Sequence, residues 1–417
     1  MNGAADLPCL TTDFPGVGGS LRNRPEDFFV QELPLYDASG DGEHVLFEAQ
    51  KIALTTRDAI NRVARALDIP PRDIGYAGLK DKHAITRQLF TVPAARGVDE
   101  ERVMTMTAEG VFPLWAAQHR NKLKIGHLAG NRFAIKIRDV DPTAVVRLRP
   151  VLDRLAREGL PNYYGEQRFG VDADRPTDAL GLALVAQDHQ RFCDLLLGGG
   201  DRRPDVAEAR RLYDSGDRRA ALAAWPGNVA MERRVLEVLV STDDPVRAAK
   251  VVDRATRRFY LSAAQSAVFN RVVADRVTRG TLARVEAGDV AVKHVAELRT
   301  GGMFVVEDIA AEQARCERWE ISPTGPMPGR KMMRPTGGPA DAERAAAEAL
   351  GVRLEDFDSE TGARRPLRVR PIDTTLAAGT DEHGGHITVA FSLPAGSFAT
   401  VLMRELMKPE RHAPHRE

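Results

Sequence analysis

Strand-like segments gather at the two ends of this chain of 417 residues and enclose a long middle stretch with helical spacing. The strand-like segments lie at 28–33, 45–50, 85–92, 133–137, 367–370 and 386–393. Apolar residues recur at helical intervals near 176–197, 204–223, 229–240 and 244–278. A helical stretch inside a strand-rich sequence is typical of an inserted domain. We therefore predict an α+β fold in which the two ends build one domain and the middle builds a second.

The predicted domain limits follow from the change of character near residue 160. Residues 1–159 and 367–417 supply the N-terminal and C-terminal parts of the first domain. Residues 160–366 form the inserted domain, which we expect to be largely helical. Two domains also suit the length of the chain, because single domains usually contain about 50–250 residues.

Composition is that of an ordinary globular protein, with 43% hydrophobic and 28% charged residues. The sequence contains no run of about 18 apolar residues, and its first residues lack the pattern of a signal peptide. We therefore expect a cytoplasmic protein that does not associate with membranes. Cys9, Cys193 and Cys316 lie far apart, and no Cys or His spacing is typical of a zinc site. The sequence accordingly predicts no metal site and no cofactor.

One loop carries a distinctive charge pattern, because the carboxylate of Asp81 lies between Lys80 and Lys82. Flanking cations stabilise the ionised form of a carboxylate. Glycines at 75 and 78 allow a tight backbone path before it, and the strand-like run 85–92 follows. An acid that is held charged suits nucleophilic or electrostatic work at a sugar carbon. The same residues are also common in an ordinary solvated turn.

Local signals predict two helices in the N-terminal part of the first domain. Thr55 and Asp58 have capping-box spacing and begin a helix that ends before Pro70. A second helix is predicted over 143–158 with Gly159 as its cap, although Pro150 inside it argues against a regular helix.

The loop from Gly75 to Gln88 resembles the signature of the TruD family of pseudouridine synthases, which reads Gly-x-Lys-Asp-Lys-x-Ala-x-Thr-x-Gln. Other segments similar to this family stand in the family's order along the chain. They are Arg24–Glu32, Gly40–His44, Gly130–Phe133, Pro161–Gly170, Leu261–Asn270 and Leu393–Thr400. Ordered matches spread over most of the chain make the resemblance specific.

The resemblance implies a mixed-sheet pseudouridine synthase catalytic domain that is interrupted by an inserted TRUD domain. It implies that the protein isomerises uridine to pseudouridine in transfer RNA, and the bacterial branch of the family acts at uridine 13 of the D arm. It also implies that Asp81 is essential and that no cofactor is used. Transfer RNA is then the partner, and we expect a monomer with no obligate protein partner.

The resemblance also implies a set of substrate-binding residues, namely Phe28, Lys80, Asn131, Phe133 and Phe398. The amide of Asn131 can bind the uracil edge and the ring of Phe133 can stack on a flipped base. The same two residues could instead be a strand-start amide and a core ring. Neighbours in a strand point to opposite faces, so only one of Phe28 and Phe29 can face the pocket, and the motif favours Phe28.

Several roles remain open at this stage. Asp81 could stabilise positive charge on the sugar, add to C1′ or take a proton from C2′. Lys80 and Lys82 could hold Asp81 ionised, contact phosphate or be solvated turn lysines. Gln167 and Arg168 could bind RNA, but their place at the predicted domain boundary favours bracing of the hinge.

A basic segment precedes and includes the Gly130–Phe133 motif, although the net charge of the chain is zero. Between His119 and Arg138 there are six basic residues and no acid. We predict phosphate contacts for the first three, Arg120, Lys122 and Lys124. The alternative is that these charges only solvate a strand face.

Two other functions are compatible with parts of the sequence. A non-catalytic RNA-binding or folding module would need the basic segment but not the Lys-Asp-Lys trio. A base-excising glycosidase would share the sugar chemistry, but no second carboxylate partnered to Asp81 is evident. Incubation with unmodified transfer RNA separates the three, because the products are pseudouridine, no change or an abasic site.

Overall fold

The computed structural model describes residues 7–21, 24–80, 82–170, 176–199 and 204–408. The chain divides into two compact units. The sheet unit contains Thr11–Leu160, His294–Gly301 and the chain from Val369 onward. The helical unit contains the N-terminal residues up to Leu10 with Pro161–Lys293 and Gly302–Arg368. The assignment of a catalytic domain and an inserted domain to the predicted limits stays a prediction.

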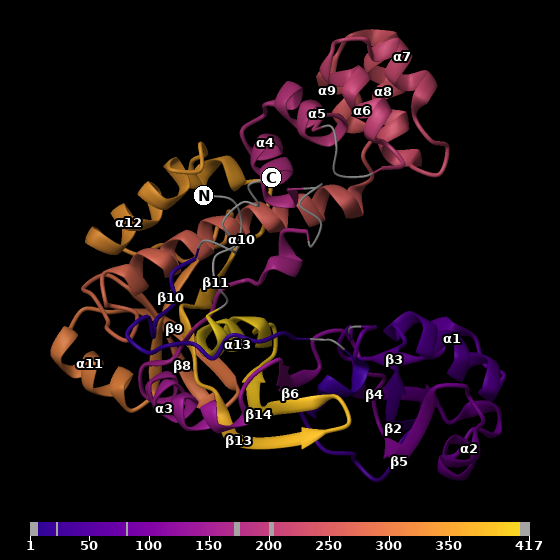
Figure 1. Cartoon of the computed structure of the whole chain (residues 1–417), viewed down its shortest axis with the longest axis vertical. Helices are drawn as coiled ribbons and strands as arrows, with labels where there is room; N and C mark the ends of the chain where they lie inside the picture. Colours follow the sequence, from indigo (N-terminus) through magenta and orange to yellow (C-terminus); the bar gives the residue numbers. More distant parts are fainter. Residues whose placement is uncertain (1–6, 22–23, 81, 171–175, 200–203, 409–417) are drawn as a thin grey trace. The chain divides into compact units, whose positions relative to one another are not determined.

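A mixed sheet of eight strands forms the sheet unit (Figure 1). Its strand order is β13-β14-β6-β1-β4-β2-β5, and β3 pairs with β4. The strands are β1 (Phe28–Pro34), β2 (His44–Ile52), β3 (Gly75–Tyr76), β4 (Ile85–Pro93), β5 (Val111–His119), β6 (Leu128–Arg138), β13 (Ile372–Asp381) and β14 (Gly384–Pro394). Strand β1 is parallel to β4 and antiparallel to β6. The predicted α+β fold is therefore confirmed.

Helix α1 (Thr56–Leu67) packs its apolar face against β2 and β4. Thr55 caps its start, and the reciprocal bonds with Asp58 complete the predicted capping box. Buried Val63 and Leu67 join a core cluster with Phe47 and Phe90. Burial of such side chains contributes roughly 1.5–3 kcal/mol each, so this core fixes α1 on the sheet.

Helix α3 (Leu148–Glu158) is shorter than the predicted helix, because residues Pro142–Arg147 form a 3₁₀ turn before it. Pro150 lies in the first turn of α3, where a missing N–H leaves no helical hydrogen bond unmade. Gly159 ends the helix at a φ of 99°, as its predicted capping role requires. The other helices of this unit are α2 (Glu100–Thr105) and α13 (Ala399–Met407).

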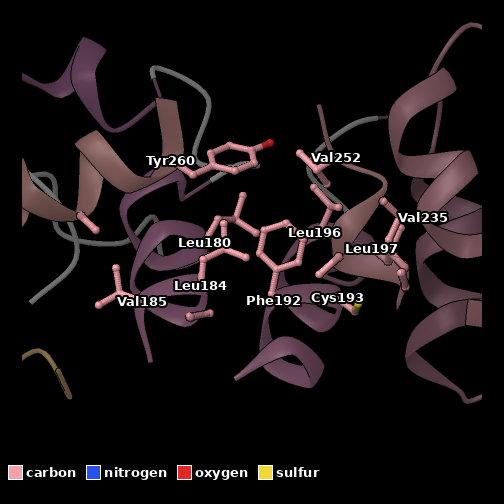
Figure 2. Packing of buried hydrophobic residues seen from close by; sticks show 14 of the residues in the cluster. Leu180, Leu184, Val185, Phe192, Cys193, Leu196, Leu197, Val235, Val252 and Tyr260 are labelled. Carbon is pink, nitrogen blue, oxygen red and sulfur yellow. The ribbon is translucent and has the colours of Figure 1, made fainter. Parts of the chain in front are cut away.

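Helices dominate residues 177–278 of the helical unit, as predicted. They are α4 (Thr177–Val185), α5 (His189–Leu197), α6 (Ala207–Asp214), α7 (Arg218–Ala224), α8 (Ala230–Thr242), α9 (Pro245–Lys250) and the long α10 (Arg254–Thr278). Figure 2 shows Leu180, Phe192, Leu196 and Tyr260 gathered in the core between these helices. This core joins α10 to α4 and α5.

A second sheet, of four strands, was not evident from the sequence. Its order is β11-β10-β8-β9, with β8 (Val290–Ala296), β9 (Arg299–Val305), β10 (Ile321–Met327) and β11 (Ala363–Pro366). Two prolines, Pro323 and Pro326, stand inside β10. Proline is uncommon in strands, so the sequence around β10 resembles a loop.

The remaining α-helices and strands are α11 (Ile309–Glu317), α12 (Gly337–Glu348) and the short pair β7 (Leu160–Pro161) and β12 (Arg368–Val369). Within the described ranges, no helix has the length and apolar character needed to cross a membrane.

Candidate active site

The residue before Asp81 is anchored to the sheet by a buried ion pair. The ammonium of Lys80 lies 2.6 Å from Glu32 Oε1, and only 7% of the Lys80 side chain and none of the Glu32 side chain is exposed. The backbone N–H of Lys80 also donates to Thr56 Oγ1 at 2.9 Å. Lys80 is therefore not a solvated turn lysine. Its role in substrate binding stays a prediction.

Glu32 receives a second hydrogen bond, from the backbone N–H of Leu89 on β4 at 3.1 Å. Burial raises the pKa of Glu32, and the charge and hydrogen bond of Lys80 oppose that rise. Gly78 leaves the space that this pair needs, because a Cβ there would lie 3.0 Å from Glu32 Oε1 and 3.1 Å from Lys80 Nζ. Glu32 was not among the site residues predicted from the sequence. A carboxylate at a buried position of an alternating strand was the available signal.

Two more side chains hold the loop that contains Gly78. Gln88 Nε2 donates to the carbonyl oxygen of Gly78 at 2.5 Å. Gln88 Oε1 accepts a hydrogen bond from Thr56 Oγ1 at 3.1 Å. Thr56 begins α1 and Gln88 lies on β4, so the helix and the sheet together fix the path of the loop. These positioning residues were also missed from the sequence.

The predicted substrate-binding residues of β1 and β6 lie on one face of the sheet. In the antiparallel register of β1 with β6, Glu32 lies opposite Asn131 and Val30 lies opposite Phe133. Phe28 lies two residues before Val30 and therefore on the same face. The rings of Phe28 and Phe133 meet edge to face at 6.5 Å. The structure thus brings Phe28, Asn131 and Phe133 to the face that also carries the Glu32–Lys80 pair.

Phe28 and Phe29 point to opposite faces, as expected for strand neighbours. Phe28 is only 4% exposed and contacts Phe133. Phe29 is half-buried, and the guanidinium of Arg87 lies 5.3 Å from its ring centroid. Phe28 is thus the ring on the face of Asn131, while Phe29 is the more accessible one. The assignment of Phe28 to the substrate stays a prediction.

Asn131 carries an unused acceptor. Its Oδ1 is buried, and no described residue donates a hydrogen bond to it. An unpaired buried acceptor costs about 1–3 kcal/mol, so this position favours a donor from a bound molecule. Strand β14 ends at Pro394 opposite Gly130, and half-buried Phe398 follows it at the start of α13. Phe398 therefore follows the end of β14 that pairs with the Gly130–Asn131 part of β6.

Asp81 itself lies outside the described residues. Its neighbours Lys82 and His83 are exposed, and buried Ala84 leads into β4. Throughout the described segments there is no group of three or more His, Cys, Asp or Glu side chains that could hold a metal ion.

An acidic residue from outside the basic segment neutralises part of that segment's positive charge in the folded protein. Arg120 forms a bidentate pair with Asp41, with Nε 2.9 Å from Oδ1 and Nη2 2.9 Å from Oδ2. Lys122 donates to the carbonyl oxygen of Arg72 at 2.6 Å. Both residues, with Lys124, line a cavity of about 480 Å³. The pair with Asp41 reduces the charge that Arg120 can offer to phosphate.

A solved structure shares this architecture over almost the whole chain. It is the crystal structure of a protein from Methanosarcina mazei assigned to tRNA pseudouridine synthase D (TruD). The TM-score is 0.84 at 25% sequence identity, and the match covers 97% of each chain. The chain thus has the fold of that class of protein.

The family model described as tRNA pseudouridine synthase D (TruD) matches residues 4–406. A curated protein of that name from Geobacter sulfurreducens is 42% identical over 414 residues, which cover 97% of both chains. One from Anaeromyxobacter dehalogenans strain 2CP-C is 39% identical over 417 residues, which cover 99% of both chains. The chain belongs to the TruD family of pseudouridine synthases.

Proposed function

We propose that this protein isomerises uridine 13 in the D arm of transfer RNA to pseudouridine, with Asp81 as its essential acid and without a cofactor. As a TruD family member, the chain is an enzyme of the pseudouridine synthase class, an isomerase that acts on uridine in transfer RNA. The position in the RNA, the role of Asp81, and action as a monomer in the cytoplasm are the proposed parts.

The isomerisation needs no external reactant. The N1–C1′ bond of uridine breaks, the uracil turns, and a C5–C1′ bond forms. C5 loses its proton and N1 gains one, so atoms and electrons balance within the nucleotide. Positive charge develops on the sugar when the first bond breaks, as in glycoside hydrolysis. A carboxylate at this point can stabilise that charge, add to C1′ or take a proton from C2′.

The observation that carries the proposal is the anchoring of Lys80. Glu32 holds its ammonium and Thr56 holds its backbone N–H, so the residue directly before Asp81 has a fixed position. Catalytic groups must be held within a fraction of an ångström of their working geometry. This arrangement supports a catalytic role for Asp81.

The face that carries Asn131 and Phe133 supports recognition of a base. The unpaired Oδ1 of Asn131 can accept a hydrogen bond from N3–H of uracil, a donor that cytosine lacks. The rings of Phe28 and Phe133 provide apolar contact beside it. A base-excising glycosidase would instead be expected to position a water molecule with a second carboxylate. The nearest buried carboxylate on this face, Glu32, is already occupied by Lys80.

The test uses an unmodified transfer RNA transcript and a matched transcript with cytidine at position 13. We expect pseudouridine at position 13 of the first transcript and no pseudouridine in the second, read by chemical labelling and primer extension. Pseudouridine at another position would overturn the assignment to uridine 13. An abasic site would favour the glycosidase, and binding without any change would favour a non-catalytic RNA-binding module.

We expect chemistry to need neither metal nor nucleotide. Extensive dialysis against EDTA should leave the single-turnover rate unchanged within about twofold, because the proposed mechanism uses only protein groups. Transfer RNA folds with divalent ions, so the control is transcript that is refolded in magnesium before EDTA-treated enzyme is added. A rate that returns only after metal is added to the enzyme would contradict the prediction.

Arg120, Lys122 and Lys124 should contribute non-specific phosphate contacts. Replacing all three with alanine should weaken binding of different RNAs similarly and lower the salt slope by about one unit per lost contact. The matched control is Asp41→Asn, which releases Arg120 from its carboxylate and should strengthen binding. Fluorescence anisotropy across a salt series measures both. An unchanged slope in the triple variant would show that these charges only solvate the surface.

A further inference from the structure

A cavity of about 550 Å³ lies in the helical unit beside the N-terminal half of α10. Arg258, Phe259 and Ser262 line it from one face of the helix. Tyr164 and Met327 complete part of its wall, and the residues from Glu360 to Ala363 complete the rest. This cavity lies outside the site described above.

Three of the lining residues contact a half-buried cation, Arg168. Its guanidinium lies 5.8 Å from the ring centroid of Tyr164 and 5.6 Å from that of Phe259. Its nitrogens donate to the hydroxyl groups of Ser262 at 2.5 Å and of Ser266 at 3.3 Å. Burial lowers the pKa of Arg168. The side chain of the adjacent Gln167 is not described.

A second guanidinium adds to the positive field. Arg365 lies 4.3 Å from the ring centroid of Tyr164, on the ring that Arg168 also contacts. It donates to Asn162 Oδ1 at 2.6 Å, which is a neutral partner. Burial, together with repulsion by Arg168, lowers the pKa of Arg365. Two neighbouring guanidinium groups at one aromatic ring favour an anion, since a buried charge is costly unless it is compensated.

Phe259 presents an aromatic face at this cavity. Its side chain is 43% exposed, which is unusual for phenylalanine on a helix. The residue directly before it, Arg258, is exposed, and α10 has no acidic residue from 254 to 274. Glu360 is the only acid among the described residues that line the cavity. An exposed ring flanked by arginines is the combination that proteins use to hold unpaired nucleotides.

We propose that this cavity binds an unpaired nucleotide of the RNA substrate, with the base stacked on Phe259 and its phosphate held by Arg258 and Arg168. The inference rests on the proposed function for the identity of the RNA. Stacking tolerates any base, so the cavity would position the RNA without selecting its sequence. Arg168, which the sequence suggested as a hinge brace, would then contribute directly to substrate binding.

The test compares two replacements of the same ring. Phe259→Leu keeps an apolar side chain but removes the aromatic face, and should weaken binding of an unmodified transfer RNA transcript about tenfold. Phe259→Tyr keeps the face and should bind within about twofold of the parent protein. Fluorescence anisotropy gives the dissociation constants, and thermal unfolding checks that each variant is folded. Equal binding by the leucine and tyrosine variants would overturn the stacking contact.

Arg258→Gln tests the phosphate contact and should lower the salt slope of transfer RNA binding by about one unit. Arg219→Gln on α7 is the control for Arg258→Gln, and Ile309→Ala on α11 is the control for Phe259→Leu, because both residues are exposed in the same unit but do not line the cavity. An Arg258→Gln slope equal to that of the parent would contradict the proposal. An equal loss of slope in Arg219→Gln would also contradict it, because it would reveal a non-specific charge effect.

A photo-cross-linking experiment locates the nucleotide directly. Transcripts with 4-thiouridine in place of uridine should cross-link to a peptide that contains Phe259 or residues 360–363. Uridine 5′-monophosphate alone should compete only at high concentration, because most of the affinity comes from other RNA contacts. Cross-links confined to peptides of the sheet unit would overturn the proposal.

These readouts measure binding and need no turnover, so the two proposals can fail separately. If the protein makes no pseudouridine but Phe259→Leu weakens transfer RNA binding, the proposed function is contradicted and the nucleotide site is supported. A protein that makes pseudouridine at position 13 and binds unchanged with Phe259→Leu would contradict the nucleotide site alone.

Discussion

Asp81→Asn should lower the single-turnover rate of pseudouridine formation by several orders of magnitude. The replacement keeps the shape of the side chain but removes its negative charge, its nucleophilic oxygen and its capacity to accept a proton. Affinity for transfer RNA should stay within about tenfold, because phosphate contacts provide most of the binding free energy. Release of tritium from 5-tritiated uridine gives the rate, and fluorescence anisotropy gives the dissociation constant.

The matched control is Asp68→Asn, the same chemical change at an exposed residue of the sheet unit. Asp68 has a φ of 53°, a conformation that asparagine also adopts readily, so this variant should fold and react normally. An active Asp81→Asn variant would remove Asp81 from the chemistry. Weak RNA binding by that variant would instead assign the residue to substrate binding.

Glu32→Gln should both destabilise the sheet unit and reduce the rate. It leaves the ammonium of Lys80 buried without a counter-charge, and breaking such a pair from one side costs about 3–5 kcal/mol. It also releases the anchor of the loop before Asp81, so the remaining folded protein should react more slowly. Urea unfolding measures the free energy of unfolding, and single-turnover kinetics under fully folded conditions measure the rate.

The double variant Glu32→Gln with Lys80→Met separates stability from positioning. Removing both charges should restore much of the free energy of unfolding, because no uncompensated charge remains buried. The rate should stay low, because the loop still lacks its anchor. As a surface comparison, breaking the exposed pair of Arg120 and Asp41 should change stability little. A Glu32→Gln protein as stable and active as the parent would refute the positioning role of this pair.

Local patterns were sufficient for the elements that surround the site. The strand-like segments 28–33 and 133–137 predicted two strands, and the spacing of Thr55 and Asp58 predicted the start of α1. Both signals depend on neighbours within a few residues, where periodicity and capping act. Strand β10 was not predicted, because its two prolines are a local signal against a strand. Pairing with the neighbouring strands of the sheet nevertheless keeps this segment extended.

The sequence by itself thus determined the strand-rich ends, the helical middle, the family resemblance and the candidate residues around Asp81. Only the tertiary structure decided which of them meet. It paired Lys80 with Glu32 across 48 positions of sequence, set Asn131 beside Glu32, and neutralised Arg120 with Asp41. Contacts between distant residues leave no local pattern, because they arise when strand pairing and burial bring separate segments together. The energies of these contacts depend on burial, which no short stretch of sequence specifies.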